Sequence, residues 1–498
     1  MAIHTSILRF SSRFLAALTF FGATAALAGQ GPPPITRDCA KVPGGNAAYK
    51  IRRCIESLPP FGGTADARGI TGDQIIDSDI FPSKPKPVTL LFGTATFNVY
   101  PSSNGYGITV PSNTKVIGAG WGKTVLRLAD YAGEWARIMG TTLGASNIQI
   151  SGIEIDGNKA HNGSPLAQNH AVLLEEADTV TITNTYIHDV NGDGIMLWGR
   201  GASAPHGYSA NIQVAGNIFV NLQRAAVSVI SGRSSVIFSN LFENNVGFEQ
   251  IHFEPDSADQ FGRDIVVERN IIHTPNVNGG ISVIANVNQG ENVSHNRIAN
   301  NLLVGGHIYI RRSPYTEITG NEVRNSNANV PILVMTRNCT ITGNIVSGTA
   351  VAQAASTNWD AGIMVEIDTT NETSGEPLPN GKNLISNNRV EGVRMAGIRL
   401  LNTSYNEVSN NVVKNVQPNY DGIAVGILLG DTYGGATTES NVLEQNQAFD
   451  DQSMHTQQFG YRIGEQVRYT QFTDNRGWGN LLATFVDNGV GTFVVQTQ

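Results

Sequence analysis

Residues 306–311 read Gly-His-Ile-Tyr-Ile-Arg, and a phrase of this kind returns about ten times between residues 170 and 430. Further copies are Asp193-Gly-Ile-Met-Leu-Trp198 and Glu249-Gln-Ile-His-Phe-Glu254. The third and fifth positions are always Ile, Val, Leu or Phe, whereas the second, fourth and sixth vary. This alternation predicts short strands with one buried face and one free face. Recurrence every few tens of residues predicts stacked units that share one continuous core.

Asparagines recur between the strand phrases, at Asn217, Asn240, Asn270, Asn301, Asn321, Asn344, Asn388 and Asn411. Asparagine tolerates the left-handed backbone conformation of a sharp corner, and its amide can bond to the same residue one coil away. The asparagines are therefore interpreted as corner residues rather than ligands. Together with the strand phrases they predict an all-β fold, a single-stranded parallel β-helix.

Composition supports one elongated solenoid of a turn-rich type, since the 498 residues include 54 Gly and only 15 % charged residues. Residues 1–28 read as a signal peptide, with Arg9, Arg13 and the small-residue site Ala26-Leu27-Ala28. We therefore expect a secreted or periplasmic protein. Removal of this segment would change the formal charge from −8 to −10. The acidic balance argues against nucleic acid as a partner, no later stretch is long enough to span a membrane, and a monomer is expected.

The predicted organisation after the signal peptide is an N-terminal cap with the first strands (29–100), the parallel β-helix (101–450), and C-terminal coils with a cap (451–498). Residues 47–58 have helical spacing and would cover the end of the core. Cys39 and Cys54 either form a disulfide or stay reduced, and the sequence leaves both open. Cys339 alternates inward and is predicted to be a buried apolar filler.

From the cap onward the chain resembles the pectate-lyase-like superfamily of secreted right-handed parallel β-helix proteins. The matching segments are the cap helix, the stretch Ile108-Thr-Val-Pro-Ser-Asn-Thr-Lys-Val-Ile-Gly-Ala-Gly120, and Ile153-Glu-Ile-Asp-Gly-Asn158. The resemblance implies a right-handed solenoid and a carbohydrate-active enzyme, since the superfamily is mostly polysaccharide lyases, glycoside hydrolases and mannuronan epimerases. The Asp-Pro-His-Asp signature of the epimerases is not found, so the resemblance assigns no catalytic residues.

The free face of the strands carries two columns of variable side chains, one residue from each coil about 4.8 Å apart. The sixth positions are Glu175, Trp198, Ile230, Glu254, Ile284, Arg311, Met335, Glu366 and Leu401. The fourth positions are Leu173, Met196, Ser228, His252, Ser282, Tyr309, Leu333, Met364 and Arg399. Polar residues concentrate in the fourth to sixth copies. This face is the predicted substrate-binding surface.

Glu254 and Asp256 are the first candidate catalytic pair, because neighbouring carboxylates separate each other's pKa values as a general acid and base require. The alternative is that they order their loop or bind Ca²⁺. His252 is placed on the solvent face beside Glu254 and is a candidate for catalysis or substrate contact. No cofactor is required by the sequence, and Ca²⁺ is the one metal considered.

Arg311, Arg312 and Arg337 are the second candidate constellation, because Arg binds carboxylate or sulfate in a bidentate fork. The alternative is that they form salt bridges to Glu254, Asp256 or Glu366. Asp193 is interpreted as a corner residue or a substrate contact. The remaining candidates for substrate contact are Glu175, Trp198, His307, Glu366 and Arg399.

Three reactions and one binding role are compatible with these candidates. In β-elimination, Arg311 and Arg312 neutralise a uronate carboxylate. His252, His307 or Tyr309 moves the protons, which makes the chain a lyase of an acidic polysaccharide. In hydrolysis, Glu254 and Asp256 cleave the glycosidic bond. The same residues are compatible with uronate C5-epimerisation and with glycan binding without catalysis, and the lyase is the first hypothesis.

Overall fold

The computed structural model describes residues 35–495 except 164–167, 205, 248, 276–278, 287–290, 350–358, 367, 369–380 and 431–437. The predicted signal peptide at residues 1–28 lies outside the described residues. Residues from Thr36 onward form one compact unit. Among the described residues, none of the helices has the length and apolar character needed to cross a membrane.

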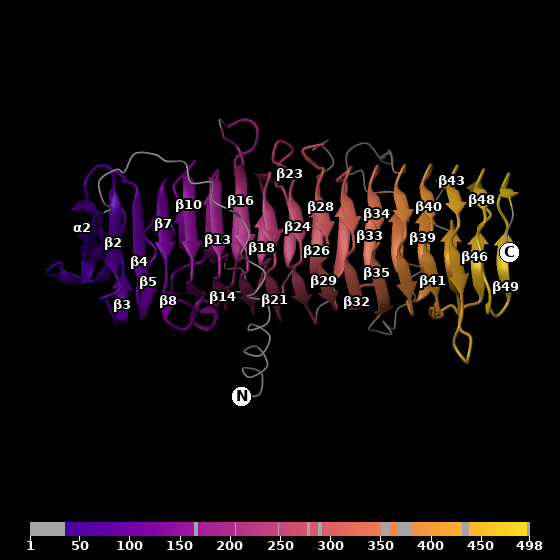
Figure 1. Cartoon of the computed structure of the whole chain (residues 1–498), viewed down its shortest axis with the longest axis horizontal. Coiled ribbons are helices and arrows are strands. Elements are labelled where there is room, and N and C mark those ends of the chain that lie inside the picture. Colours follow the sequence, from indigo (N-terminus) through magenta and orange to yellow (C-terminus); the bar gives the residue numbers. More distant parts are fainter. Residues whose placement is uncertain are drawn as a thin grey trace, which may run out of the picture. The chain divides into compact units, whose positions relative to one another are not determined.

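Three long parallel sheets run along this unit, and the chain visits each sheet once in nearly every coil (Figure 1). Sheet A has 20 strands and sheets B and C have 14 each. Each strand pairs with its counterpart in the next coil, as Tyr186 does with Ile218 in sheet B. The predicted single-stranded, right-handed parallel β-helix is confirmed.

Sheet A consists of β1 (Thr36–Asp38), β2 (Gly63–Ala67), β4 (Val88–Phe92), β7 (Thr114–Ile117), β10 (Ser146–Ser151), β13 (Asp178–Thr183), β16 (Ser209–Ala215), β19 (Gly232–Arg233), β20 (Val236–Phe238), β23 (Gly262–Arg263), β24 (Val266–Glu268), β27 (Val293–Ser294), β28 (Arg297–Ala299), β31 (Glu317–Thr319), β34 (Thr340–Thr342), β37 (Leu384–Ser386), β40 (Glu407–Ser409), β44 (Val442–Glu444), β48 (Gln471–Thr473) and β50 (Phe493–Val495). A separate short pair joins β43 (Thr438–Glu439) to β47 (Val467–Arg468).

Sheet B consists of β3 (Gly72–Ile76), β5 (Ala95–Val99), β8 (Thr124–Leu128), β11 (Glu154–Asp156), β14 (Tyr186–His188), β17 (Ile218–Val220), β21 (Leu241–Glu243), β25 (Ile271–His273), β29 (Leu302–Val304), β32 (Glu322–Ser326), β35 (Ile345–Thr349), β38 (Arg389–Glu391), β41 (Val412–Lys414) and β45 (Gln447–Phe449).

Sheet C consists of β6 (Tyr106–Val110), β9 (Arg137–Thr141), β12 (His170–Glu175), β15 (Ile195–Trp198), β18 (Val227–Val229), β22 (Ile251–Phe253), β26 (Gly280–Ile284), β30 (His307–Arg311), β33 (Ile332–Met335), β36 (Ile363–Glu366), β39 (Met395–Leu401), β42 (Ala424–Leu429), β46 (Phe459–Ile463) and β49 (Ala483–Asp487). Its strands are the repeating phrases of the sequence.

The core lies between the three sheets, and sheet C contributes to it the third and fifth positions of the phrase. In β30, for example, Ile308 and Ile310 are fully buried. Burial of each such side chain contributes roughly 1.5–3 kcal/mol. Cys339 is buried and unpaired among them, as predicted.

The N-terminal end of the core is covered by helix α2 (Ala47–Glu56), preceded by the 3-10 turn η2 (Cys39–Lys41). Asn46 caps the helix by accepting a hydrogen bond from the Tyr49 N–H at 3.0 Å. The predicted apolar face is buried and includes Ile51 and Ile55. A disulfide joins Cys39 and Cys54, which resolves the alternative that the sequence left open.

The predicted asparagines form a continuous ladder of side-chain amides at the corners before the sheet B strands from β17 to β41. The Asn217 amide donates to the Asn240 Oδ1 at 3.0 Å, and Asn240 donates in the same way to Asn270. The ladder runs on to Asn475, past the predicted end at Asn411. It fixes the register of the coils, so each outward side chain of sheet C lies directly above the next.

Candidate functional site

The outer face of sheet C carries the predicted columns in the predicted order. Register places the fourth-position residues side by side, in the order Leu173, Met196, Ser228, His252, Ser282, Tyr309, Leu333, Met364 and Arg399. In the other column Glu175 pairs with Trp198, and Arg311 lies between Ile284 and Met335. Two clusters of ionisable side chains lie along these columns.

The first cluster surrounds Arg224, which lies in the corner before β18. Its members are Asp193, Arg224, Glu249, His252, Glu254 and Asp256, called here the Arg224 cluster. The Arg224 Nε lies 3.4 Å from Asp193 Oδ1, and the Arg224 Nη2 lies 3.8 Å from Glu254 Oε2. One guanidinium therefore contacts both carboxylates from neighbouring coils.

Asp193 is fully buried behind this cluster. Its Oδ1 accepts a hydrogen bond from the Ala225 N–H at 3.0 Å, and its Oδ2 lies 3.3 Å from His170 Nδ1. Burial alone would raise the pKa of Asp193, but His170, Arg224 and Ser228 outweigh it and hold that pKa below the usual range. Its 0 % exposure means that Asp193 positions Arg224 and cannot touch a ligand directly. The corner interpretation therefore fits better than substrate contact.

His252 lies on β22, between the carboxylates of Glu249 and Glu254. Its Nδ1 is 3.7 Å from Glu254 Oε2 and 3.8 Å from Glu249 Oε2. The residue is only 6 % exposed, so its predicted position on the solvent face is wrong. Burial lowers the pKa of His252, against the opposing effect of Glu249, so the imidazole is neutral near pH 7.

Glu254 and Asp256 differ from the other members in being open to solvent. The Glu254 side chain is 46 % exposed, and Asp256 is exposed. Burial raises the pKa of Glu254, and the charges of Asp193 and Asp256 raise it further while Arg224 opposes them. Burial also raises the pKa of Asp256, again against Arg224. The structure thus brings together the pair that the sequence predicted.

The second cluster surrounds Asp368 and contains Arg311, Arg312, Glu366 and Arg399. The Arg311 fork meets both carboxylate oxygens of Asp368, at 3.2 and 3.3 Å, and the Arg312 Nε bonds to the same group. Asp368 is buried. The salt-bridge alternative named Glu254, Asp256 or Glu366 as partners, and the structure shows Asp368 as a partner of both Arg311 and Arg312.

Buried charges fill the rest of this Asp368 cluster. Burial raises the pKa of Glu366 to about 7, with Arg399 opposing and Asp368 adding to the shift. Arg399 is fully buried and His307 nearly so, which removes both from direct contact with a large ligand. Tyr309 lies between the two clusters: burial raises its pKa, and the charges of Asp368 and Glu249 add to this effect.

The remaining candidates lie apart from the two clusters. Trp198 is partly buried and packs with Tyr106 on an apolar patch formed by Leu173, Met196 and Ile230. Glu175 adjoins this patch, since it adds to the raised pKa of Tyr106. Arg337 is half-buried in the corner after β33, in the next coil from Arg312.

Sequence reasoning missed Arg224, Glu249 and Asp368, which hold the two clusters together. Arg224 and Asp368 lie outside the six-residue phrase, and Glu249 is the first residue of its copy, a position that varied without pattern. A signal for Arg224 did exist, because it directly precedes the phrase Ala225–Ile230 and is the only cation in that corner of the sequence.

The Ca²⁺ alternative at Glu254 and Asp256 stays a prediction. Among the described residues, the His, Cys, Asp and Glu side chains close enough to share a metal ion are Asp156, His188 and Asp189. These three lie on sheet B, away from both clusters.

Comparisons with known proteins agree on the fold. Residues 98–254 match the family described as a right-handed β-helix region. The preneck appendage proteins of Bacillus phages PZA and phi29 are 27 % identical to this chain over 163 residues, which cover 31 % of it but only 18 % of those proteins. The chain therefore has the right-handed parallel β-helix fold that the sequence resemblance implied.

Solved structures extend this likeness over nearly the whole chain. The tailspike protein of E. coli bacteriophage HK620, solved in complex with a pentasaccharide, has a TM-score of 0.54 at 12 % identity and covers 90 % of this chain and 77 % of its own. The A-module of a mannuronan C-5 epimerase from Azotobacter vinelandii has a TM-score of 0.41 at 13 % identity, with 91 % and 96 % covered. At such identities the likeness concerns the fold alone.

Proposed function

We propose that the chain is a secreted glycoside hydrolase that cleaves a polysaccharide bound along the outer face of sheet C. Glu254 is the general acid and Asp256 the general base. The observation that carries this proposal is the solvent-open carboxyl pair beside a buried cluster of charge. The charge of Asp256 is one of the causes that raise the pKa of Glu254, and in the proposed mechanism Asp256 loses its proton first.

The two roles follow from that order of titration. With Asp256 ionised and Glu254 still protonated, Glu254 donates its proton to the oxygen of the leaving sugar. Asp256 either activates a water molecule or attacks the sugar itself. The distance between the carboxyl groups of Glu254 and Asp256 decides whether the configuration of the sugar is inverted or retained. Arg224 positions Glu254, because its other end is fixed to the buried Asp193.

Hydrolysis is preferred to β-elimination because of the arginines. Elimination requires a cation that neutralises the uronate carboxylate. Arg311 and Arg312, the candidates for that role, both bind the buried Asp368. Hydrolysis requires no such cation. For the same reason the substrate face near Glu254 favours a neutral glycan over the anionic one first predicted.

The stacked columns suit a linear glycan. Equivalent side chains repeat at about 4.8 Å along the sheet, close to the length of one sugar unit. The HK620 tailspike, solved with a bound pentasaccharide, supports the view that a solenoid of this fold can bind an oligosaccharide. Trp198, two coils from Glu254 in the same column, would lie against a sugar two units away.

The test is a screen of neutral and acidic polysaccharides with three readouts for each. Hydrolysis gives new reducing ends without ultraviolet absorbance of an unsaturated uronate. Absorbance would establish elimination instead, altered uronate configuration would establish epimerisation, and binding without any product would establish a non-catalytic glycan-binding protein. Each of these three results overturns the proposal.

The pH profile gives a second test on an active substrate. Activity should rise as Asp256 loses its proton and fall as pH rises through the raised pKa of Glu254, which gives a bell-shaped profile. Asp256→Asn should remove the acidic limb together with most of the turnover. A profile without an alkaline limb in the wild-type chain would contradict Glu254 as the acid.

A further inference from the structure

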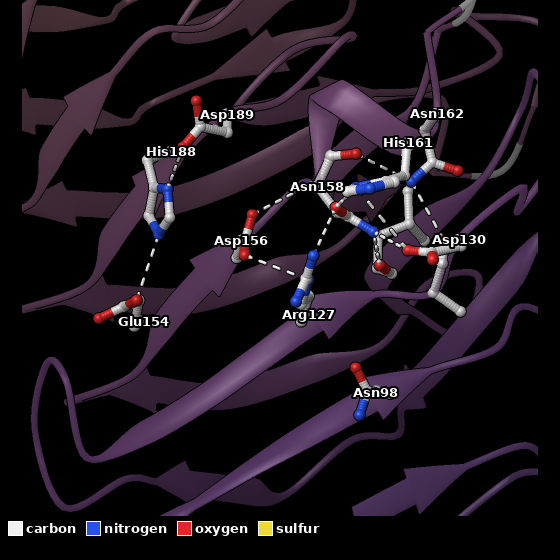
Figure 2. Close-up of polar contacts among 12 residues, drawn as sticks. Asn98, Arg127, Asp130, Glu154, Asp156, Asn158, His161, Asn162, His188 and Asp189 are labelled. Carbon is white, nitrogen blue, oxygen red and sulfur yellow. Dashed lines mark hydrogen bonds and ion pairs between the residues drawn. The ribbon is translucent and has the colours of Figure 1, made fainter. Parts of the chain in front are cut away.

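The outer face of sheet B carries a separate group of ionisable side chains (Figure 2). Asp156 ends β11 and His188 ends β14, and register pairs them directly across neighbouring coils. One ligand atom each from Asp156, His188 and Asp189 lie within 4.8 Å of one another. We propose that these three side chains bind one divalent transition-metal ion, Zn²⁺ or Mn²⁺.

The His188 ring is held in one orientation. It stacks on the Tyr186 ring with centroids 4.5 Å apart, and its Nε2 lies 3.3 Å from Glu154 Oε1. Glu154 is itself fixed, because its other oxygen accepts a hydrogen bond from the Gly122 N–H at 2.8 Å. A carboxylate on the far nitrogen of a histidine is the usual support of a metal-bound imidazole, since it fixes the tautomer.

This orientation turns Nδ1 toward the carboxylates. The Asp189 Oδ2 lies 2.6 Å from His188 Nδ1, and Figure 2 shows Asp156 on the adjoining strand beside them. A metal ion would replace the proton that joins His188 to Asp189, and binding would release that proton to solvent.

Contacts around the two aspartates hold them in place. The Asp156 Oδ1 accepts a hydrogen bond from the Asn158 N–H at 2.7 Å, and its Oδ2 lies 3.5 Å from Arg127 Nε. The Asp189 Oδ1 accepts from the Asn221 amide. Each carboxylate therefore keeps unused lone pairs while its position is fixed, which is what a preformed site requires.

The types of ligand atom and their exposure to solvent indicate which metal ion would bind. One imidazole nitrogen with two carboxylates suits Zn²⁺ or Mn²⁺, whereas Ca²⁺ takes oxygen ligands only. The side chains of His188, Asp156 and Asp189 are 14 %, 21 % and 42 % exposed, so an ion and its remaining water ligands can enter from solvent. Two cations adjoin the site: Arg127 Nε lies 3.5 Å from Asp156 Oδ2, and Lys159 interacts with the charge of Asp189.

The inferred ion would join the coils of β11 and β14 from outside. It lies on a different sheet from the Arg224 cluster, so it would stabilise the solenoid without entering the proposed reaction. The competing explanation is that His188 only bridges Glu154 and Asp189 by hydrogen bonds. The experiment must separate these two, and its outcome is independent of whether the chain is a hydrolase.

The experiment is calorimetric titration of the metal-stripped, tag-free full chain with Zn²⁺, Mn²⁺ and Ca²⁺ salts in turn. We expect one saturable site for Zn²⁺ or Mn²⁺ and much weaker binding of Ca²⁺. Asp156→Asn and His188→Gln should abolish the site, and Glu154→Gln should weaken it about 10–100-fold. The matched control is His161→Gln, an exposed imidazole 4.0 Å from Asp130, which should bind as the wild type does.

Melting temperature completes the test. The wild type should melt higher with Zn²⁺ than with chelator, and Asp156→Asn should melt at the same temperature in both. Asp156→Asn keeps its shape and its contact with the Asn158 N–H, so it serves if His188→Gln fails to fold. Absence of saturable binding in the wild type, or equal binding in the wild type and Asp156→Asn, overturns the proposal in favour of a hydrogen-bonded bridge.

Discussion

The asparagine ladder and the Arg224 cluster are both polar, and both continue from coil to coil, yet their hydrogen bonding differs. Asn321 in the ladder donates to Asn344 Oδ1 at 3.0 Å and to the Ile298 carbonyl at 2.8 Å, and accepts from the Asn301 N–H at 3.0 Å. The contacts of Arg224 with Asp193 and Glu254 are longer, and burial raises three carboxyl pKa values around it.

The difference teaches how to separate structure from function in a solenoid. A polar residue that repeats in every coil finds its partner in the next coil, and its hydrogen bonds are complete. A polar residue that breaks the repeat meets side chains of another type in the neighbouring coils, as Arg224 meets Asp193 and Glu254. Carboxyl groups with shifted pKa values are therefore found where the repeat is broken, and a catalytic site is expected at such positions.

Glu254→Gln is expected to have the largest effect, and it tests whether the Arg224 cluster is catalytic. The change keeps the shape but removes the proton donor, so turnover should fall about 10²–10⁴-fold while the melting temperature stays the same. Steady-state kinetics and thermal melting check this. The matched control is Glu243→Gln on sheet B, another glutamate beside a histidine, at 3.5 Å from His273. Equal turnover in both variants would remove Glu254 from the reaction.

Glu366→Gln tests whether the Asp368 cluster makes the free energy of unfolding depend on pH. The pKa of Glu366 is raised from 4.5 to about 7, so the folded chain holds this proton more tightly than the unfolded chain. The stabilisation is present below pH 4.5 and is lost as pH rises through about 7, on the order of 3 kcal/mol. Glu366→Gln should lack this loss between pH 5 and pH 8 in denaturant unfolding. The same slope in variant and wild type would contradict it.

Asn321→Ala tests the ladder side of the comparison. Because the buried Asn301 N–H loses its acceptor, the free energy of unfolding should fall by about 1–3 kcal/mol. Asparagine does not titrate, so the loss should be equal at pH 5 and pH 8, and turnover should persist. The control is Asn98→Ala, whose amide makes a single 3.4 Å contact with the Gln74 carbonyl and should change stability by less than about 0.5 kcal/mol.

Arg311→Lys should have the smallest effect. Lysine keeps the charge but loses the planar fork to Asp368, while Arg312 still binds the same carboxylate, so stability should fall by less than about 1 kcal/mol. Activity on a neutral glycan should be unchanged and insensitive to salt. Lost turnover in a variant of normal stability would restore Arg311 as a clamp for an anionic substrate.

The repeat, and the structural elements whose positions follow its period, could be predicted from the sequence alone. The strand phrases, the cap helix, the asparagine corners and the two columns of sheet C were all predicted residue by residue, because burial alternates with period two and each coil copies the last. A second asparagine ladder, from Asn383 through Asn406 to Asn441, was missed because its members lie in less regular segments.

The site was predicted only in part, for the same reason. Glu254, Asp256 and His252 lie in or beside a strand phrase, so periodicity placed them correctly along the sheet. The burial of His252 and Asp193 depends on neighbours from other coils, which no local pattern contains. Arg224 and Asp368 come from corners whose conformation the period does not determine, although they decide which carboxyl groups remain exposed.

Sequence separation along the ladder has an evolutionary consequence. Asn301 and Asn321 are 20 residues apart, whereas Asn344 and Asn388 are 44 apart, and yet both pairs keep an amide contact of 2.9–3.0 Å. An excursion of 24 additional residues (44 less 20) has thus been accommodated without altering the join between two coils. New loops can be acquired, exchanged or removed at such a corner while the scaffold is inherited unchanged. Loop length at such a corner is free to change, whereas the asparagine contact between the coils is kept.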